Sequence, residues 1–138
     1  MLDEIILIDD DKIVTAVNKK IISKLLPKAS IKTFENGEEG LVYLIAAQDA
    51  NLRTLVFLDL SMPIMDGFQF LNIYENTMAH QEHSFVICLL TSSIAKEDQQ
   101  KATNFPSVLE YAQKPLNETA IRGLIERATQ KLNQKSTF

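Results

Sequence analysis

The sequence lacks several features that would place a chain of this size in other classes of protein. It has one cysteine, Cys88, so no disulfide can form within the chain, which fits a reducing compartment. Its formal net charge is -4, which gives no overall basic footprint for nucleic acid or an anionic membrane. Residues 1–4 hold no basic n-region, and no long apolar run follows. These absences predict a cytoplasmic protein without a nucleic-acid or membrane partner.

The apolar residues that are present indicate strands alternating with helices. Five short apolar runs predict strands at residues 5–8, 30–34, 55–60, 85–91 and 108–112. Apolar residues recur at helical spacing between and after them, at Ile13, Val17, Ile21 and Leu25; Leu41, Leu44 and Ile45; Leu71, Tyr74 and Met78; and Ile121, Leu124, Ile125, Ala128 and Leu132. Residues 95–104 give the weakest helical pattern because they are polar almost throughout. We therefore expect one α/β domain, a doubly wound five-stranded parallel sheet flanked by five helices.

Polar residues follow the apolar runs at four predicted strand ends. They are Asp9, Asp10 and Asp11, then Asp59, then Thr91, Ser92 and Ser93, and finally Lys114 and Pro115. The carboxyl ends of parallel strands meet at one edge, where such sheets bind ligands. Carboxylates gathered there repel one another unless a cation holds them ionised, and oxygen ligands on loops suit Mg2+. The sequence therefore predicts an acidic magnesium site at this edge.

Asp59 is the acid that we expect to act as a nucleophile. A carboxylate can take a phosphoryl group to form an acyl phosphate, with Lys114 and Mg2+ neutralising the transferred oxygens and Thr91 offering a hydrogen bond. Each residue alone has a plainer interpretation as a helix cap, a buried threonine or a solvated charge. The coincidence at four strand ends favours the site. Asp11 is the exception, and we expect it to cap the first helix.

The motifs at these strand ends, in this order, resemble the receiver domain of two-component response regulators. The matching stretches are residues 6–11, ILIDDD; 58–67, LDLSMPIMDG; 90–93, LTSS; and 111–115, YAQKP. The resemblance covers residues 2–133 and implies a flavodoxin-like fold with strand order 2-1-3-4-5. It leads us to expect a receiver domain over residues 1–133 and a short tail over 134–138, with no output domain.

The resemblance also implies a role for each site residue. Asp59 would accept a phosphoryl group from a phosphohistidine on a sensor histidine kinase or phosphotransfer protein. Asp10 would ligate Mg2+ directly, Asp9 directly or through water, and Ser61 through its backbone carbonyl. Further roles are implied for residues around them: phosphoryl contacts for Thr91 and Lys114, an aromatic switch for Tyr111, a cis peptide before Pro115, and an influence on acyl-phosphate lifetime for Ser61 and Ser93.

The loop after Asp59 and two less typical segments carry further expectations. Asp66 is expected to cap the third helix, the apolar residues before it to be packing, and Gly67 to relieve a backbone constraint. Residues 103–107, TNFPS, stand where the family usually has a small glycine-containing turn. The loop that holds His80 and His83 is expected to be solvated, because it lies at the amino end of the fourth strand, away from Asp59.

Three functions remain in competition at this point. The leading one is a phosphorylatable receiver, a signalling protein that catalyses only its own phosphorylation and dephosphorylation and passes its signal by docking to a downstream protein or by onward phosphotransfer. The second is a receiver-like adaptor that docks without phosphate. The third is an aspartyl-nucleophile phosphatase of the haloacid-dehalogenase type, which typically needs a second Asp where this chain has Ser61.

Overall fold

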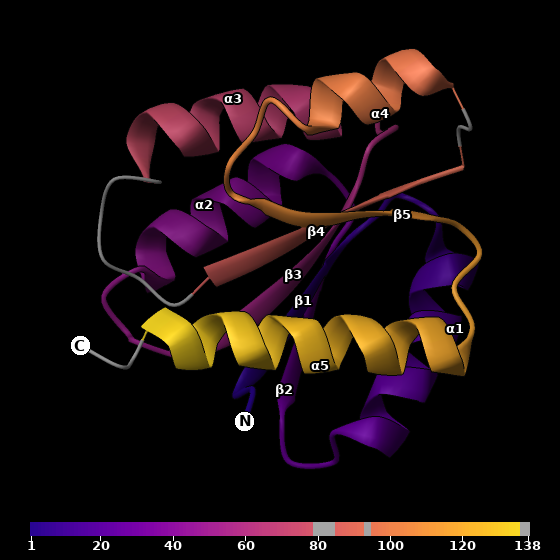
Figure 1. Ribbon diagram of the computed structural model, residues 1–138, viewed down its shortest axis with the longest axis vertical. Coiled ribbons are helices and arrows are strands. Elements are labelled where there is room, and N and C mark those ends of the chain that lie inside the picture. The colour runs from indigo at the N-terminus through magenta and orange to yellow at the C-terminus, as the bar shows by residue number, and fades with distance from the viewer. Residues whose placement is uncertain (79–84, 93–94, 136–138) are drawn as a thin grey trace.

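The computed structural model of the 138-residue chain describes residues 1–78, 85–92 and 95–135. Strands and helices alternate along them (Figure 1). Their bounds are β1 Glu4–Ile8, α1 Lys12–Leu25, β2 Ser30–Phe34, α2 Gly37–Ala47, β3 Thr54–Asp59, α3 Gly67–Thr77, β4 Phe85–Thr91, α4 Lys96–Ala102, β5 Val108–Gln113 and α5 Glu118–Lys135. The five predicted strands and five predicted helices are therefore confirmed.

The strands form one parallel sheet in the order β2-β1-β3-β4-β5, as the resemblance implied. Every residue of the three central strands, β1, β3 and β4, is buried, which explains their continuous apolar runs. β2 lies at one edge and is largely exposed, and β5 at the other edge is only partly buried. All strands run in the same direction, so their carboxyl ends meet at one edge of the sheet.

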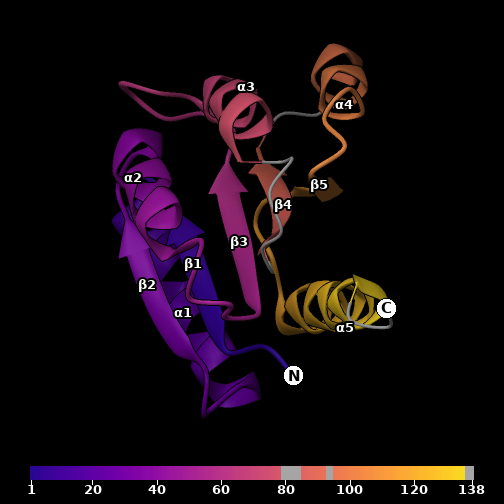
Figure 2. The same cartoon turned by 90° about the vertical axis from the view of Figure 1, so that its left-hand side faces the viewer.

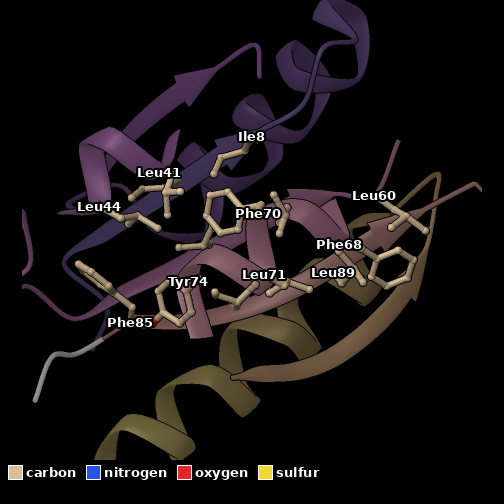
Figure 3. Close-up of a cluster of buried hydrophobic side chains, with 14 of the residues drawn as sticks. Ile8, Leu41, Leu44, Leu60, Phe68, Phe70, Leu71, Tyr74, Phe85 and Leu89 are labelled. Carbon is tan, nitrogen blue, oxygen red and sulfur yellow. The ribbon is translucent and has the colours of Figure 1, made fainter. Parts of the chain in front are cut away.

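Two apolar clusters cover the two faces of the sheet. One packs α2, α3 and Ala102 of α4 against one face and includes Phe70, Leu71 and Tyr74 (Figure 3). The other packs α1 and α5 against the opposite face and includes Ile22 and Ile121. Figure 2, which turns the molecule by 90°, shows α2 and α3 on the side of the sheet away from α5. Cys88 is fully buried in the α1/α5 cluster, as expected for a small core residue.

The helix predicted from the apolar stripe of α1 is confirmed, but only part of that stripe faces the core. Ile13 is 77% exposed and Val17 is 50% exposed, whereas Asn18 and Ile22 are the buried residues of the helix. Steps of four residues advance about 40° beyond a full turn, so a stripe from Ile13 to Leu25 drifts by roughly 120° around the helix. Its first half therefore leaves the core.

The carboxyl end of the chain also differs from the expected boundary. α5 continues to Lys135, so residues 134 and 135 belong to the last helix rather than to a tail. The predictions for the loop with His80 and His83, and for Ser93, lie outside the described residues. Within the described part of the chain, no helix combines the length and apolar character needed to cross a membrane.

Candidate functional site

Three carboxylates and one ammonium group meet at the carboxyl edge of the sheet. Asp9, Asp10 and Asp59 each offer an oxygen, and these oxygens lie within 4.8 Å of one another. Lys114 Nζ lies 2.7 Å from Asp9 Oδ2 and 3.2 Å from Asp59 Oδ1. The sequence placed these four residues at three strand ends, and the structure brings them together.

Backbone contacts at the end of β1 fix Asp9 and Asp11. Asp9 N–H donates to Phe34 O of the neighbouring strand at 3.0 Å, and Asp9 Oδ1 accepts from Asp11 N–H at 2.9 Å. Asp11 Oδ1 in turn accepts from Ile13 and Val14 N–H, so it caps α1 as predicted. Asp9 is thus buried and held, whereas Asp10 between them is exposed.

Asp59 ends β3 and is 4% exposed. The following residue continues the ladder, because Leu60 N–H donates to Leu90 O at 2.8 Å. Ser61 N–H donates to Asp59 Oδ1 at 3.4 Å. Burial and then the charge of Asp9 raise the pKa of Asp59 to about 6, against the opposing influence of Lys114.

Lys114 is held at the site by its own backbone. Its N–H donates to Thr91 O at 2.7 Å, which places it beside the end of β4, where Thr91 is buried. Burial lowers the pKa of Lys114, but the hydrogen bond to Asp9 and the charge of Asp59 outweigh it, so the pKa is raised and the lysine stays charged. The Lys114–Pro115 peptide is cis, the geometry that the resemblance implied.

A bulge in β5 decides where Tyr111 lies. Ile87 pairs with Val108 but Cys88 pairs with Glu110, so Leu109 is an extra residue on β5. Without it, strand alternation would put Tyr111 on the face opposite Val108; with it, both pack against the α2/α3 cluster. The Tyr111 hydroxyl is buried and has no hydrogen-bond partner within the described part of the chain.

The loop from β3 to α3 corrects two expectations. Ile64 is not packing, since it is 74% exposed, and it has a φ of 71° in a tight turn closed by Met65 N–H to Pro63 O at 2.8 Å. Gly67 has no positive φ. A Cβ on Gly67 would instead lie 2.9 Å from Asp59 O, so glycine is needed for close approach of α3 to the site strand.

The start of α3 is fixed as predicted. Asp66 Oδ1 accepts from Gln69 N–H at 2.8 Å, and Gln69 Oε1 accepts from Asp66 N–H at 2.9 Å, a reciprocal capping box. Beside it, a cavity of about 550 Å³ opens next to the acids. Its lining includes Asp10 and Ser61, and also Asp98 of α4, which the sequence pattern did not single out.

The segment that departs from the family pattern is fastened to α3. Phe105 stacks with Phe68 at a ring-centroid distance of 6.0 Å, and Lys101 Nζ lies 4.5 Å from the centroid of the Phe68 ring. Ser107 donates to Glu75 Oε1 through both its N–H, at 3.0 Å, and its hydroxyl, at 2.7 Å. These contacts fix the connection between α4 and β5 without a glycine turn.

The donor set fits a hard divalent cation. Three carboxylates against one ammonium leave an excess of negative charge, and all the donors are oxygens on loops and strand ends. Burial and then the negative charge of Asp9 raise the pKa of Asp59, and both effects oppose an ionised Asp59 when no cation is bound. The residues present are therefore suited to Mg2+.

A doubly wound sheet in the order 2-1-3-4-5, with acids and a lysine at its carboxyl edge, defines the receiver class of signalling modules. The model of the response regulator receiver domain matches residues 5–126, and the chain belongs to this family. Its members are signalling modules of two-component systems rather than metabolic enzymes.

Proteins of known identity and structure agree with this membership. A two-component response regulator from Cytophaga hutchinsonii is 27% identical, with a TM-score of 0.81 over 94% of this chain and 98% of its own. The REC domain of AraT, a response regulator from Geobacillus stearothermophilus, shares the fold at 22% identity, with a TM-score of 0.79 over 99% and 100% of the two chains. Hybrid signal transduction histidine kinase L of Dictyostelium discoideum is 27% identical over 139 residues; the match covers 99% of this chain but 8% of the kinase.

Proposed function

We propose that this protein is a phosphorylatable receiver in which Asp59 accepts a phosphoryl group from a phosphohistidine. The observation that carries the proposal is the difference between the two buried acids. Asp9 uses both oxygens, Oδ1 toward Asp11 N–H and Oδ2 toward Lys114. The hydrogen bond and ion pair of Asp59 both fall on Oδ1, which leaves Oδ2 without either in the described part of the chain. Asp59 therefore has an oxygen available for attack on phosphorus.

Asp9, Asp10 and Asp59 would hold Mg2+, with the backbone carbonyl of Ser61 as a further ligand. When bound, the ion supplies charge neutralisation for the phosphoryl oxygens. Lys114 keeps its positive charge beside Asp59 and would contact the transferred group from the protein side. Thr91, buried at the end of the neighbouring strand, would donate its hydroxyl to the same group.

Tyr111 would report the phosphorylation. Its hydroxyl is buried without a hydrogen bond in the described part of the chain, which is unfavourable for the conformation observed. Movement of Thr91 toward the phosphoryl group would change the packing around Tyr111 and so bias a two-state element on the α4, β5 and α5 side. A sensor histidine kinase or phosphotransfer protein would be the phosphoryl donor, and a downstream protein the reader.

The proposal is tested by incubating the protein with phosphoramidate, with and without Mg2+, and measuring its intact mass. We expect one phosphoryl addition that requires Mg2+ and is absent in Asp59→Asn. A protein that stays unlabelled under these conditions would be the constitutive adaptor instead. Continuous hydrolysis of a small phosphoester without accumulated label would point to the phosphatase.

A further inference from the structure

Charges of opposite sign are separated on the first two helices of this chain. Residues 12–32, which contain α1, hold six of the 14 basic residues and none of the 18 acidic residues. Residues 33–52, which contain α2, hold four acidic residues and no basic residue. The net charge of -4 conceals this separation, because the two blocks partly cancel each other.

The outer side of α1 is basic and carries two exposed apolar residues. We call its exposed residues, which recur at intervals of four, three and four, the lysine face: Ile13, Val17, Lys20 and Lys24. Ile13 is 77% exposed and Val17 is 50% exposed. Asn18 and Ile22, which are buried, lie on the opposite side of the helix. The lysine face therefore points away from the sheet.

The outer side of α2 has a similar composition with the opposite charge. We call its exposed residues the acidic face: Glu38, Glu39, Val42, Ile45 and Ala46. Val42 is 63% exposed and Ile45 is 42% exposed. Leu41 and Leu44, on the other side of the helix, are buried against the sheet. The acidic face therefore also points away from the sheet.

The chain's own charges leave both faces largely unpaired. Lys24 lies 3.4 Å from Glu118 in an exposed pair, which contributes little stability. Lys20, Glu38 and Glu39 form no ion pair within the described residues. Lys24 suits the carboxyl end of α1, and the two glutamates suit the amino end of α2. These helix ends do not explain the apolar residues left exposed beside the charges.

We propose that the lysine face of one molecule binds the acidic face of a second copy of this chain. The faces are complementary in charge, and each offers two apolar residues, Ile13 and Val17 on one and Val42 and Ile45 on the other. Nucleic acid or an anionic membrane could contact only the lysine face, because the acidic face would repel it. A second copy of the chain explains both faces at once.

The positions of the two faces make this association head-to-tail. α1 and α2 pack on opposite faces of the sheet, and each exposed face lies on the outer side of its helix. Two molecules that join through one pair of faces therefore leave the other pair free. Such contacts build open chains rather than closed dimers. The inference is independent of the proposed phosphoacceptor function, because it involves neither Asp59 nor its phosphorylation.

Sedimentation equilibrium of the unphosphorylated full chain tests the association. One helix face is much smaller than a standard interface of roughly 20–30 residues a side, so we expect weak binding. At about 50 mM NaCl, the weight-average mass should rise by about half as the protein is concentrated from about 10 μM to about 1 mM. At about 0.5 M NaCl, where the Debye length is only a few ångströms, the rise should fall to less than half that size.

Two variants each remove one face. Lys20→Glu reverses a charge on the lysine face, and Val42→Lys places a positive charge within the acidic face, both at exposed positions. Each variant alone should stay monomeric. An equimolar mixture should form a complex of one molecule of each that grows no further, because each variant keeps the face that the other lacks. Lys131→Glu, the same charge change as Lys20→Glu on an exposed position of α5, should associate like the wild type.

The mixture distinguishes a lost face from a lost fold, since only folded variants can bind each other. A wild-type protein that stays monomeric at about 1 mM and low salt would overturn the proposal. So would association that persists in either variant alone, because the faces would then not carry it. A mixture no more associated than the separate variants would also overturn it, since the two faces would not be binding each other.

Discussion

Strand β1 has a buried carboxylate at each end, and the protein stabilises the two in different ways. At the amino end, Glu4 is 1% exposed and accepts hydrogen bonds from the Tyr43 hydroxyl and, at 3.3 Å, from Thr54 Oγ1. At the carboxyl end, Asp9 shares one lysine with Asp59. Uncharged hydroxyl groups donate the hydrogen bonds that Glu4 accepts. At the carboxyl edge, one lysine faces both Asp9 and Asp59, so negative charge remains in excess.

This difference separates a structural acid from the acids of the proposed phosphorylation site. Glu4 in β1 connects this strand to α2 through Tyr43 and to β3 through Thr54. Burial and the hydrogen bond to Glu4 raise the pKa of Tyr43 to about 12. Its network is complete within the fold. The carboxyl edge is left with unfavourable electrostatics that a bound cation would relieve, which is how functional sites commonly differ from stabilising ones.

Removing the lysine should produce the largest change in stability. Lys114→Met leaves Asp9 and Asp59 facing each other without a cation, so the free energy of unfolding at pH 7 should fall by about 3 kcal/mol. Urea denaturation in metal-free buffer measures it. The control is Lys131→Met, an exposed lysine on α5, which should change stability by less than about 0.5 kcal/mol. Equal losses in both variants would contradict the account of the carboxyl edge.

At the amino edge the acid itself should be stabilising. Glu4→Ala leaves the Tyr43 hydroxyl without its buried acceptor, whereas Thr54 Oγ1 keeps Leu52 O at 3.2 Å, and the change should cost about 2 kcal/mol. Glu4→Gln keeps an acceptor oxygen and should cost less. Added Mg2+ should leave both differences from the wild type unchanged, since this network lies at the other end of β1 from Asp9. A difference that depends on Mg2+ would show that the two edges are not independent.

The pH dependence of stability should come from the carboxyl edge. The pKa of Asp59 is raised from 3.8 to about 6, so the native state binds its proton more tightly than the unfolded chain does. Without metal, the free energy of unfolding should therefore rise as pH falls from 7 to 4, with a contribution from Asp59 of at most about 3 kcal/mol. Asp59→Asn should be more stable than the wild type at pH 7 and lose this advantage by pH 4. A constant difference across this range would contradict the raised pKa.

The smallest expected difference in stability between the two edges of the sheet comes from backbone strain in their loops. Ile64, in the loop after Asp59, has a φ of 71°, and Asn51, in the loop before β3, has a φ of 55°. Asparagine tolerates this conformation and a β-branched residue does not. Ile64→Gly should therefore stabilise the protein by about 1 kcal/mol, whereas Asn51→Gly should be close to neutral. Ile64→Ala keeps the Cβ and should give little of the gain; a full gain in the alanine variant would assign the effect to the exposed side chain.

The sequence predicted what depends on local pattern. Continuous apolar runs located β1, β3 and β4, and the polar residues that end them identified Asp9, Asp59 and Lys114, because parallel strands bring their carboxyl ends together. The capping roles of Asp11 and Asp66 followed from their places before helices. These features require only the order of residues along one element.

Features that depend on packing between elements were not predicted. The apolar stripe of α1 did not reveal which part of it leaves the core, and Asn18 is buried in its place. No residue type marked the bulge at Leu109 that puts Tyr111 on the α2/α3 side. Glycine is needed at position 67 because a Cβ there would lie 2.9 Å from Asp59 O of β3, a contact that the sequence around Gly67 does not indicate.

The most direct test of the central claim is to locate the phosphoryl group. Protein labelled with phosphoramidate and Mg2+ is treated with borohydride, which reduces an aspartyl phosphate to homoserine, and its peptides are sequenced by mass spectrometry. The account predicts homoserine at position 59 alone, because Asp59 Oδ2 lies beside Lys114 and has no hydrogen bond or ion pair among the described residues. Homoserine at position 9 or 10 with Asp59 intact, or label that survives on another type of residue, would contradict it.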